Sequence, residues 1–181
     1  MAEPLFIASY HAAVLAALKK LKWVRDADIY PERVTQLTTP AVFFSVDGWD
    51  AQSNADGQMR VVLSASLWVL IDRAATSDIG KPDIYIRAVA ADLTQWIDGQ
   101  TFGLERVDPA VFISADADET DPAMDDYLVW QITFNQGVSF GEDPFATGNL
   151  PLQRVWIGIS PEIGKQHVDD YRLIYERKPN E

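Results

Sequence analysis

The clearest pattern in the chain is a strict alternation of apolar and polar residues within Tyr127–Phe140. Leu128, Trp130, Ile132 and Phe134 fall on one side of an extended chain. The other side carries Tyr127, Val129, Gln131, Thr133 and Asn135. A period of two in a run rich in aromatic and β-branched residues predicts a β-strand. We expect the apolar side to face the core and the polar side to face water or a partner.

A second alternating run, Met59–Asp72, predicts another long strand with one aliphatic face. That face carries Val61, Leu63, Ala65, Leu67, Val69 and Ile71. The shorter run Pro40–Val46 predicts a buried strand that Pro40 opens and Gly48 closes. Between the two strands, Asp47–Gln58 is polar and carries turn-forming residues, so we expect a loop in which Trp49 stands alone. This loop favours an antiparallel hairpin.

Two further segments show helical periodicity. Residues 4–22 carry an apolar stripe at steps of three and four residues, formed by Ile7, Tyr10, Val14, Leu18 and Leu21. The second predicted helix is Asp83–Asp98, and its stripe contains Ile86, Val89, Ala90, Leu93, Trp96 and Ile97. Pro82 lies near the start of this helix and Gly99 lies just past its end, which is the usual placement of both residue types.

The remaining segments complete the order of elements. Residues 23–39 form a mixed connector, Phe102–Ser114 holds a third strand, and Asp116–Asp126 is a charged connection into the first strand described. Residues 141–151 are rich in Gly, Pro and Asn and predict a linker to a short extension. The order predicts an α+β fold: a small antiparallel sheet of about four strands in two hairpins, flanked by two helices. We assign residues 1–140 to this core and residues 141–181 to the linker and C-terminal extension.

Composition narrows the possible functions. The net charge of −12 and the pI of about 4.5 argue against a basic nucleic-acid-binding surface. The charge serves solubility, or it forms an acidic surface that DNA passes without sticking. The chain has no cysteine, so disulfides, Cys-zinc sites and thiol nucleophiles are excluded. Glu3 lies where a secretion signal needs basic residues, and no window of about 18 apolar residues predicts a membrane span.

The acidic run before the long strand was compared with a calcium-binding loop. Asp116, Asp118 and Thr120 suit its first ligand positions. However, Asp121 stands where the loop needs Gly, and Tyr127 stands where it needs Glu, so the template fails. We interpret the run as a solvated charge cluster that also discourages unwanted edge pairing.

Other chemistry is equally sparse. His11 and His167 lie far apart in the sequence without further ligands at organised spacing, so we expect no metal site. The sequence contains no nucleophile elbow, phosphate-binding loop or dinucleotide fingerprint. Neighbouring acids such as Asp47 and Asp50 arise by chance in a chain with 27 acids. We therefore predict a protein that is not an enzyme and uses no cofactor.

Four segments, in this order, carry a family resemblance. After a first helix come Pro40-Ala-Val-Phe-Phe, the strand Met59–Asp72, a helix of the type Arg87-Ala-Val-Ala-Ala-Asp-Leu, and Tyr127-Leu-Val-Trp-Gln-Ile-Thr-Phe. The arrangement resembles the tail terminator (tail completion) proteins of Mu-like and P2-like contractile-tailed phages and their prophages. The resemblance covers roughly residues 4–140 and rests on order and pattern. The C-terminal segment also looks like tails found on some of these proteins.

The resemblance implies a structural virion protein. Such proteins form a ring, typically of six copies, at the head-proximal end of the tail tube, where they stop polymerisation and offer a docking face to the head–neck connector. It implies assembly in the host cytoplasm, contact with the tube and with the sheath, and no enzymatic activity. The alternatives are another neck, connector or tube-like subunit, and a small enzyme or ligand-binding domain.

A closed ring needs two complementary surfaces on each subunit. We expect contacts with subunits or partners at Trp49, Gln131, Thr133 and Asn135. DNA passes through such a ring without specific binding, and an acidic lumen would repel its phosphates. The candidate lumen residues are Asp116, Asp118, Glu119, Asp121, Asp125 and Asp126. The C-terminal extension could reach a neighbouring subunit, the tube or the sheath.

Overall fold

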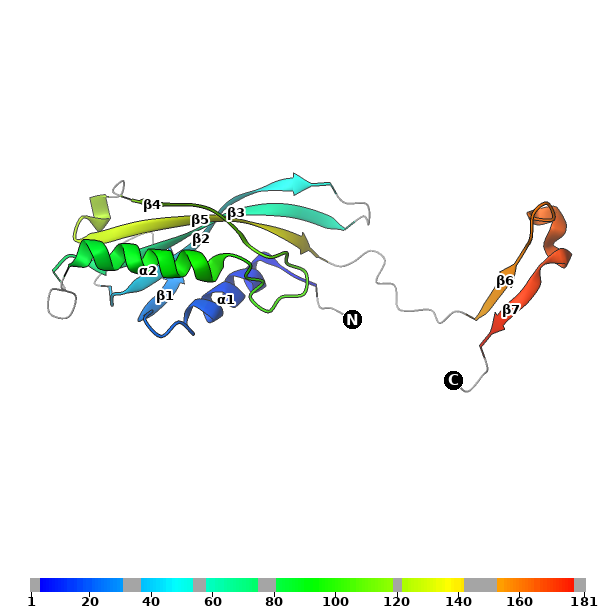
Figure 1. Ribbon diagram of the computed structural model, residues 1–181, viewed down its shortest axis with the longest axis horizontal. Helices are drawn as coiled ribbons and strands as arrows, with labels where there is room; N and C mark the ends of the chain where they lie inside the picture. The colour runs from blue at the N-terminus through cyan, green and yellow to red at the C-terminus, as the bar shows by residue number, and fades with distance from the viewer. Residues whose placement is uncertain are drawn as a thin grey trace. The chain divides into compact units, whose positions relative to one another are not determined.

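The computed structural model describes residues 4–30, 37–53, 58–74, 81–118, 122–141 and 153–177 (Figure 1). The chain divides into two compact units, Met1–Pro144 and Phe145–Glu181. Several residues named above lie outside the described residues: positions 54–57 of the predicted loop, Glu119, Thr120, Asp121 and residues 142–151 of the predicted linker.

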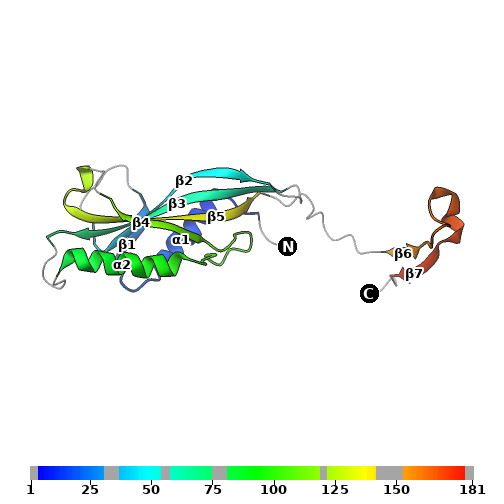
Figure 2. The same cartoon turned by 45° about the horizontal axis from the view of Figure 1, so that its top comes forward.

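In the first unit, one sheet is covered on one face by two helices, which confirms the predicted α+β class (Figures 1 and 2). The sheet order is β1-β2-β3-β5-β4. Its strands are β1 (Asp26–Ile29), β2 (Ala41–Gln52), β3 (Met59–Asp72), β4 (Val111–Ala117) and β5 (Tyr127–Phe140). The helices are α1 (Ile7–Leu18) and α2 (Pro82–Ile97), and a short 3-10 helix, η1 (Pro122–Met124), precedes β5.

The two central strands, β3 and β5, have the bounds that the alternating pattern predicts. They pair antiparallel along their whole length, from Met59 opposite Phe140 to Asp72 opposite Tyr127. The six aliphatic residues predicted to share one face of β3 are all buried. They pack against the apolar stripes of α1 and α2, so the main core lies between the helices and the sheet.

Strand β2 is longer than predicted. The sequence suggests that Gly48 ends the strand and that the following residues form a loop. In the structure β2 continues to Gln52, and its register with β3 shifts between Val46 and Gly48, which marks a β-bulge. Residues after the bulge still pair with β3, because β3 extends beyond the predicted end of β2 and offers a continuous partner. The loop prediction is therefore wrong for residues 47–52.

Strand β1 was expected to be part of a connector. It pairs in parallel with the first residues of β2, from Asp26 opposite Ala41 to Ile29 opposite Phe44. The sheet therefore has five strands and is mixed, one strand more than the sequence predicts. Strand β4 begins within the predicted segment Phe102–Ser114 and continues to Ala117, so Asp116 belongs to the strand and not to the charged connection. Helix α1 is shorter than the predicted residues 4–22.

One polar side chain is buried within the apolar core. Gln136 lies on the helix-facing side of β5, between Phe134 and Val138, and is 1% exposed. Its Oε1 accepts a hydrogen bond from Tyr10 Oη at 2.5 Å. Its Nε2 donates to the carbonyl oxygens of Gln100 and Asp108 at 2.8 and 2.7 Å. The side chain thus ties α1, β5 and the segment after α2 together.

A smaller apolar cluster lies on the other face of the sheet. It contains Ala41, Phe43, Leu70, Met124 and Val129. Val129 belongs to the side of β5 that was expected to be polar, so that expectation is wrong at this end of the strand. The physical reason is η1, because its Met124 covers the end of the sheet where Leu70 and Val129 lie.

The second unit contains a two-stranded antiparallel sheet, formed by β6 (Arg154–Ile157) and β7 (Arg172–Glu176), with the 3-10 helix η2 (Lys165–Asp170) between the strands (Figure 1). We call residues 153–177 the C-terminal arm. None of the described residues of the arm is buried.

Candidate interaction surface

The face of the sheet opposite α1 and α2 is the candidate functional surface, and we call it the open face. Cross-strand pairing and side-chain alternation place on it residues from four strands. These residues are Asp47 and Asp50 of β2, Arg60, Val62, Ser64, Ser66 and Trp68 of β3, Gln131, Thr133, Asn135 and Gly137 of β5, and Ser114 and Asp116 of β4. The surface is polar along most of its length.

A chain of hydrogen bonds crosses the middle of the open face. Gln131 Nε2 donates to Ser66 Oγ at 3.1 Å, and Ser66 Oγ donates to Asp47 Oδ2 at 2.5 Å. Ser66 is fully buried beneath its neighbours, although it lies on this face. Asp47 can reach Ser66 because it sits in the β2 bulge, where an extra residue changes the direction of the side chain. The network therefore links three strands and holds the bulge in place.

An acidic region lies beside this network. Asp116 of β4 pairs directly with Gln131 across the strands, and its side chain is exposed. Asp118, just after β4, accepts a hydrogen bond at 3.3 Å from Nε1 of Trp68. The indole of Trp68 also packs against the ring of Tyr30, with 4.6 Å between the ring centroids. The indole, itself packed against Tyr30, thus orients the Asp118 carboxylate, while the Asp116 carboxylate faces water.

The other end of the open face holds an ion pair. The guanidinium of Arg60 pairs with the carboxylate of Asp108, and Arg60 Nε donates to Gln52 Oε1 at 2.9 Å. The Asp108 side chain lies directly over the Cα of Gly137, where no Cβ would fit. Gly137 is therefore required by the close approach of a side chain rather than by a turn.

The structure brings most of the expected contact residues together. Gln131, Thr133 and Asn135 lie on the open face in neighbouring rows with Asp116, and Asp118 lies at its border. Two groups of residues that the sequence treats separately thus share one surface. The sequence suggested no role for Asp47, Ser66, Arg60 or Asp108, and the distances between them along the chain explain why.

The other expected residues lie elsewhere. Trp49 is opposite Leu63, which faces the helices, so Trp49 lies on the face opposite to Gln131 and is 56% exposed. It belongs to β2 and not to a loop. Asp125 and Asp126 are exposed in the turn between η1 and β5. The backbone carbonyl of Asp126 accepts a hydrogen bond from Arg73 N.

The described parts of the chain contain no group of three or more His, Asp or Glu side chains arranged to hold a metal ion. His11 lies in α1 against Phe44, with 5.0 Å between the ring centroids, and burial lowers its pKa. His167 lies in the C-terminal arm, 3.1 Å from Asp170 Oδ2. Neither histidine lies on the open face.

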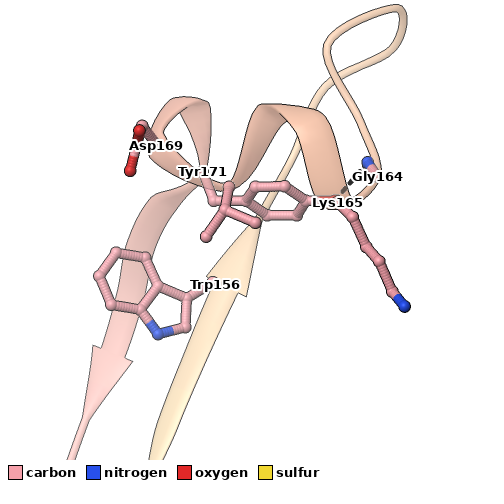
Figure 3. A pocket seen from close by; sticks show the side chains of 6 residues that line it. Trp156, Gly164, Lys165, Asp169 and Tyr171 are labelled. Atoms are coloured by element: carbon pink, nitrogen blue, oxygen red, sulfur yellow. Dashed lines mark hydrogen bonds between the residues drawn. The ribbon is translucent and has the colours of Figure 1, made fainter.

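A pocket of about 740 Å³ lies in the C-terminal arm (Figure 3). It is lined by Trp156, Gly164, Lys165, Val168, Asp169 and Tyr171. The backbone N–H of Gly164 donates to the Tyr171 hydroxyl at 2.9 Å, and the Lys165 side chain points away from Trp156 (Figure 3). The pocket is open and mainly apolar, and its charged groups do not converge.

Comparisons of the chain with models of known protein families and with curated proteins found no match. Within the described residues, no helix has both the length and the apolar character needed to cross a membrane.

Proposed function

We propose that the chain is a structural subunit of a contractile phage tail, the terminator that forms a ring at the head-proximal end of the tail tube. The ring, typically of six copies, stops tube polymerisation and offers a docking face to the head–neck connector. The basis is the resemblance of residues 4–140 to tail terminator proteins. It is supported by the sheet order, because the strands that carry the resemblance, β2, β3 and β5, are consecutive neighbours in one sheet.

The observation that carries the proposal is the character of the open face. It spans several strands, is acidic and polar, and has no group of three or more potential metal ligands among the described residues. A surface of this kind suits contact and passage rather than chemistry. Asp116 and Asp118 lie on it or at its border beside Gln131, so a single surface could serve both the lumen and a subunit contact.

In the proposed ring, the acidic part of the open face borders the lumen. Exposed carboxylates repel DNA phosphates over roughly 8–10 Å at physiological salt. This range is sufficient to keep a duplex from adhering to the wall while it passes. The net charge of −12 on every subunit is consistent with this role, because each copy adds to the same field.

Electron microscopy and mass measurement of the purified full-length chain test the proposal. A terminator gives closed rings with a central hole and no growth beyond the ring. Long filaments would identify a tube-like subunit instead. Monomeric particles at high concentration would contradict the proposal and favour a small ligand-binding domain.

A further inference from the structure

We propose that the C-terminal arm of one copy docks along the unpaired edge of β2 in a second copy and adds a strand to its sheet. The docking site is Ser45–Gln52, the part of β2 that β1 leaves uncovered. The proposal deepens the proposed function and rests on it for the presence of a neighbouring copy. It names the two surfaces that hold consecutive subunits together.

The C-terminal arm does not bury its own apolar side chains. Five large ones are more than half exposed: Trp156, Ile159, Ile163, Val168 and Ile174. An isolated two-stranded sheet is at best marginally stable in water. Domains this small usually need disulfides, metals or association, and the chain has no cysteine. The arm therefore requires a surface that covers it.

The edge of β2 offers such a surface. Strand β1 pairs only with Ala41–Phe44, so among the described residues the outward N–H and C=O groups of Ser45–Gln52 have no strand partner. An unpaired edge of this length is a template for strand addition. It exceeds the length of β6 and of β7, so either strand of the arm fits along it. The exposed indole of Trp49 supplies apolar area beside the edge.

Charge favours a second copy of this chain as the partner. Residues 145–181 contain five Lys or Arg and five Asp or Glu, whereas residues 1–144 contain 10 and 22. The arm segment is therefore neutral, and the rest of the chain carries the whole net charge of −12. Two acidic units repel each other, but a neutral arm can approach the edge that carries Asp47 and Asp50. Arg172 of β7 is a cation of the arm that can face this edge, whereas Arg154 of β6 is paired with Glu176 within the arm.

The length of the connecting segment also suits a second copy. Residues 142–152 connect the described parts, and a chain of this length spans at most about 40 Å. Gln52 pairs with Arg60, and Arg60 pairs with Ser139 near the end of β5. The β2 edge of the same copy thus lies only two strands, about 10 Å, from the start of the connection. Eleven residues are more than this short path needs, so the segment is long enough to reach a neighbouring subunit as well as its own, and the cross-linking below distinguishes the two.

Single cysteines test the proposal directly, because the native chain has none. One full-length chain carries Ala51→Cys in the β2 edge. A second chain, distinguishable by an affinity tag, carries Ile157→Cys in β6 or Ile174→Cys in β7. The two are mixed, allowed to assemble and treated with a short bismaleimide, which tolerates a wider range of distances than a disulfide. The control replaces Ala51→Cys by Asp92→Cys, an exposed position on α2.

We expect cross-linked dimers of the two different chains with Ala51→Cys at a yield roughly tenfold or more above the Asp92→Cys control, because docking raises the local concentration of the thiols. No cross-link above control for either arm position overturns the proposal. A further variant carries Ala51→Cys and one arm cysteine in the same chain. If its cross-link forms only within single chains and never between two chains, the proposal is overturned as well.

Electron microscopy of the same samples distinguishes failure of the arm proposal from failure of the terminator proposal. Rings without the cross-link would sink the arm proposal and leave the terminator proposal standing. Cross-linked chains that grow into filaments would support the arm contact and contradict the terminator proposal.

Discussion

The Tyr10 hydroxyl of α1 donates a 2.5 Å hydrogen bond to Oε1 of Gln136 in β5, across 126 residues of sequence. Both side chains are almost completely buried, and burial raises the pKa of Tyr10, so the phenol remains a hydrogen-bond donor at neutral pH. Nε2 of Gln136 in turn donates hydrogen bonds to the backbone carbonyls of Gln100 and Asp108. This pair holds α1 against the sheet and fixes the segment that supplies Asp108 to the open face.

Tyr10→Phe should lower the free energy of unfolding by about 1–3 kcal/mol, because Gln136 Oε1 would remain buried without a donor. Urea denaturation measures the change. The matched control is Tyr85→Phe, since Tyr85 is a half-buried tyrosine of α2 without a hydrogen-bond partner among the described residues. The control should change stability by less than about 0.5 kcal/mol. Equal losses in both variants would show that the buried hydrogen bond contributes nothing specific.

Gly137→Ala should destabilise the protein by about 1–3 kcal/mol, because the added Cβ would overlap with the Asp108 carboxylate and displace it from Arg60. Gly48→Ala is the control, since a Cβ at Gly48 in β2 meets no atom within 4 Å. Thermal unfolding compares the two variants. In an Asp108→Ala background, Gly137→Ala should cost much less. A full loss in that background would show that Asp108 is not the obstacle.

Stability should decrease when the pH falls from about 7.5 to about 5.5, with a contribution from His11 whose ordinary pKa is about 6.5. Burial lowers the pKa of His11 in the folded state, and its Nδ1 is buried without a hydrogen-bond partner among the described residues. The unfolded chain therefore takes up the proton first, so stability is retained above the ordinary pKa and lost below it. His11→Phe should flatten the decrease measured by denaturation at each pH.

The native chain is the reference for this pH dependence. A His11→Phe profile that falls as steeply as the native one would show that the assignment to His11 is wrong.

Asp116→Lys should make the assembled protein retain duplex DNA at low salt, with retention that falls as salt is added, because a cation would replace an anion on the proposed lumen wall. Filter binding of assembled rings measures retention. Asp92→Lys changes the net charge equally but lies exposed on α2, on the helical layer. The Asp92 variant should not retain DNA. Equal retention by both variants would mean that net charge acts without regard to position.

The sequence was sufficient where a pattern is long and local. The bounds of β3 and β5 follow from 14 residues of alternation each, and α2 follows from its apolar stripe and the flanking Pro82 and Gly99. It failed where pairing decides the structure. Asp26–Ile29 has two acids in four residues and becomes a strand only because the edge of β2 accepts it in parallel. The bulge at Asp47 could likewise not be predicted, because it is defined by the register of β2 against β3.

The polar contacts were harder to predict than the strands. Gln136 alternates with Phe134 and Val138 along β5, and this position indicates that its side chain is buried. Its hydrogen-bond partner, Tyr10, is 126 residues away in the sequence, so the contact could not be predicted. The open-face network needs Asp47 and Gln131 on either side of Ser66. Side chains so far apart in the sequence meet only through the strand order. The sequence predicts the two hairpins, β2 with β3 and β4 with β5, but not the pairing of β3 with β5 that joins them. The residue types of the candidate surface were predicted in part, but their assembly was not.

The central claim is that the chain ends a growing tail tube, and tube growth in its presence tests this claim most directly. Cognate tube subunits are polymerised with and without the purified chain, and tube ends are examined by electron microscopy with a label on the chain. If the chain is a terminator, growth stops and a labelled ring sits at one end of each tube. Tubes that elongate unchanged with bare ends, or label spread along their length, would contradict it.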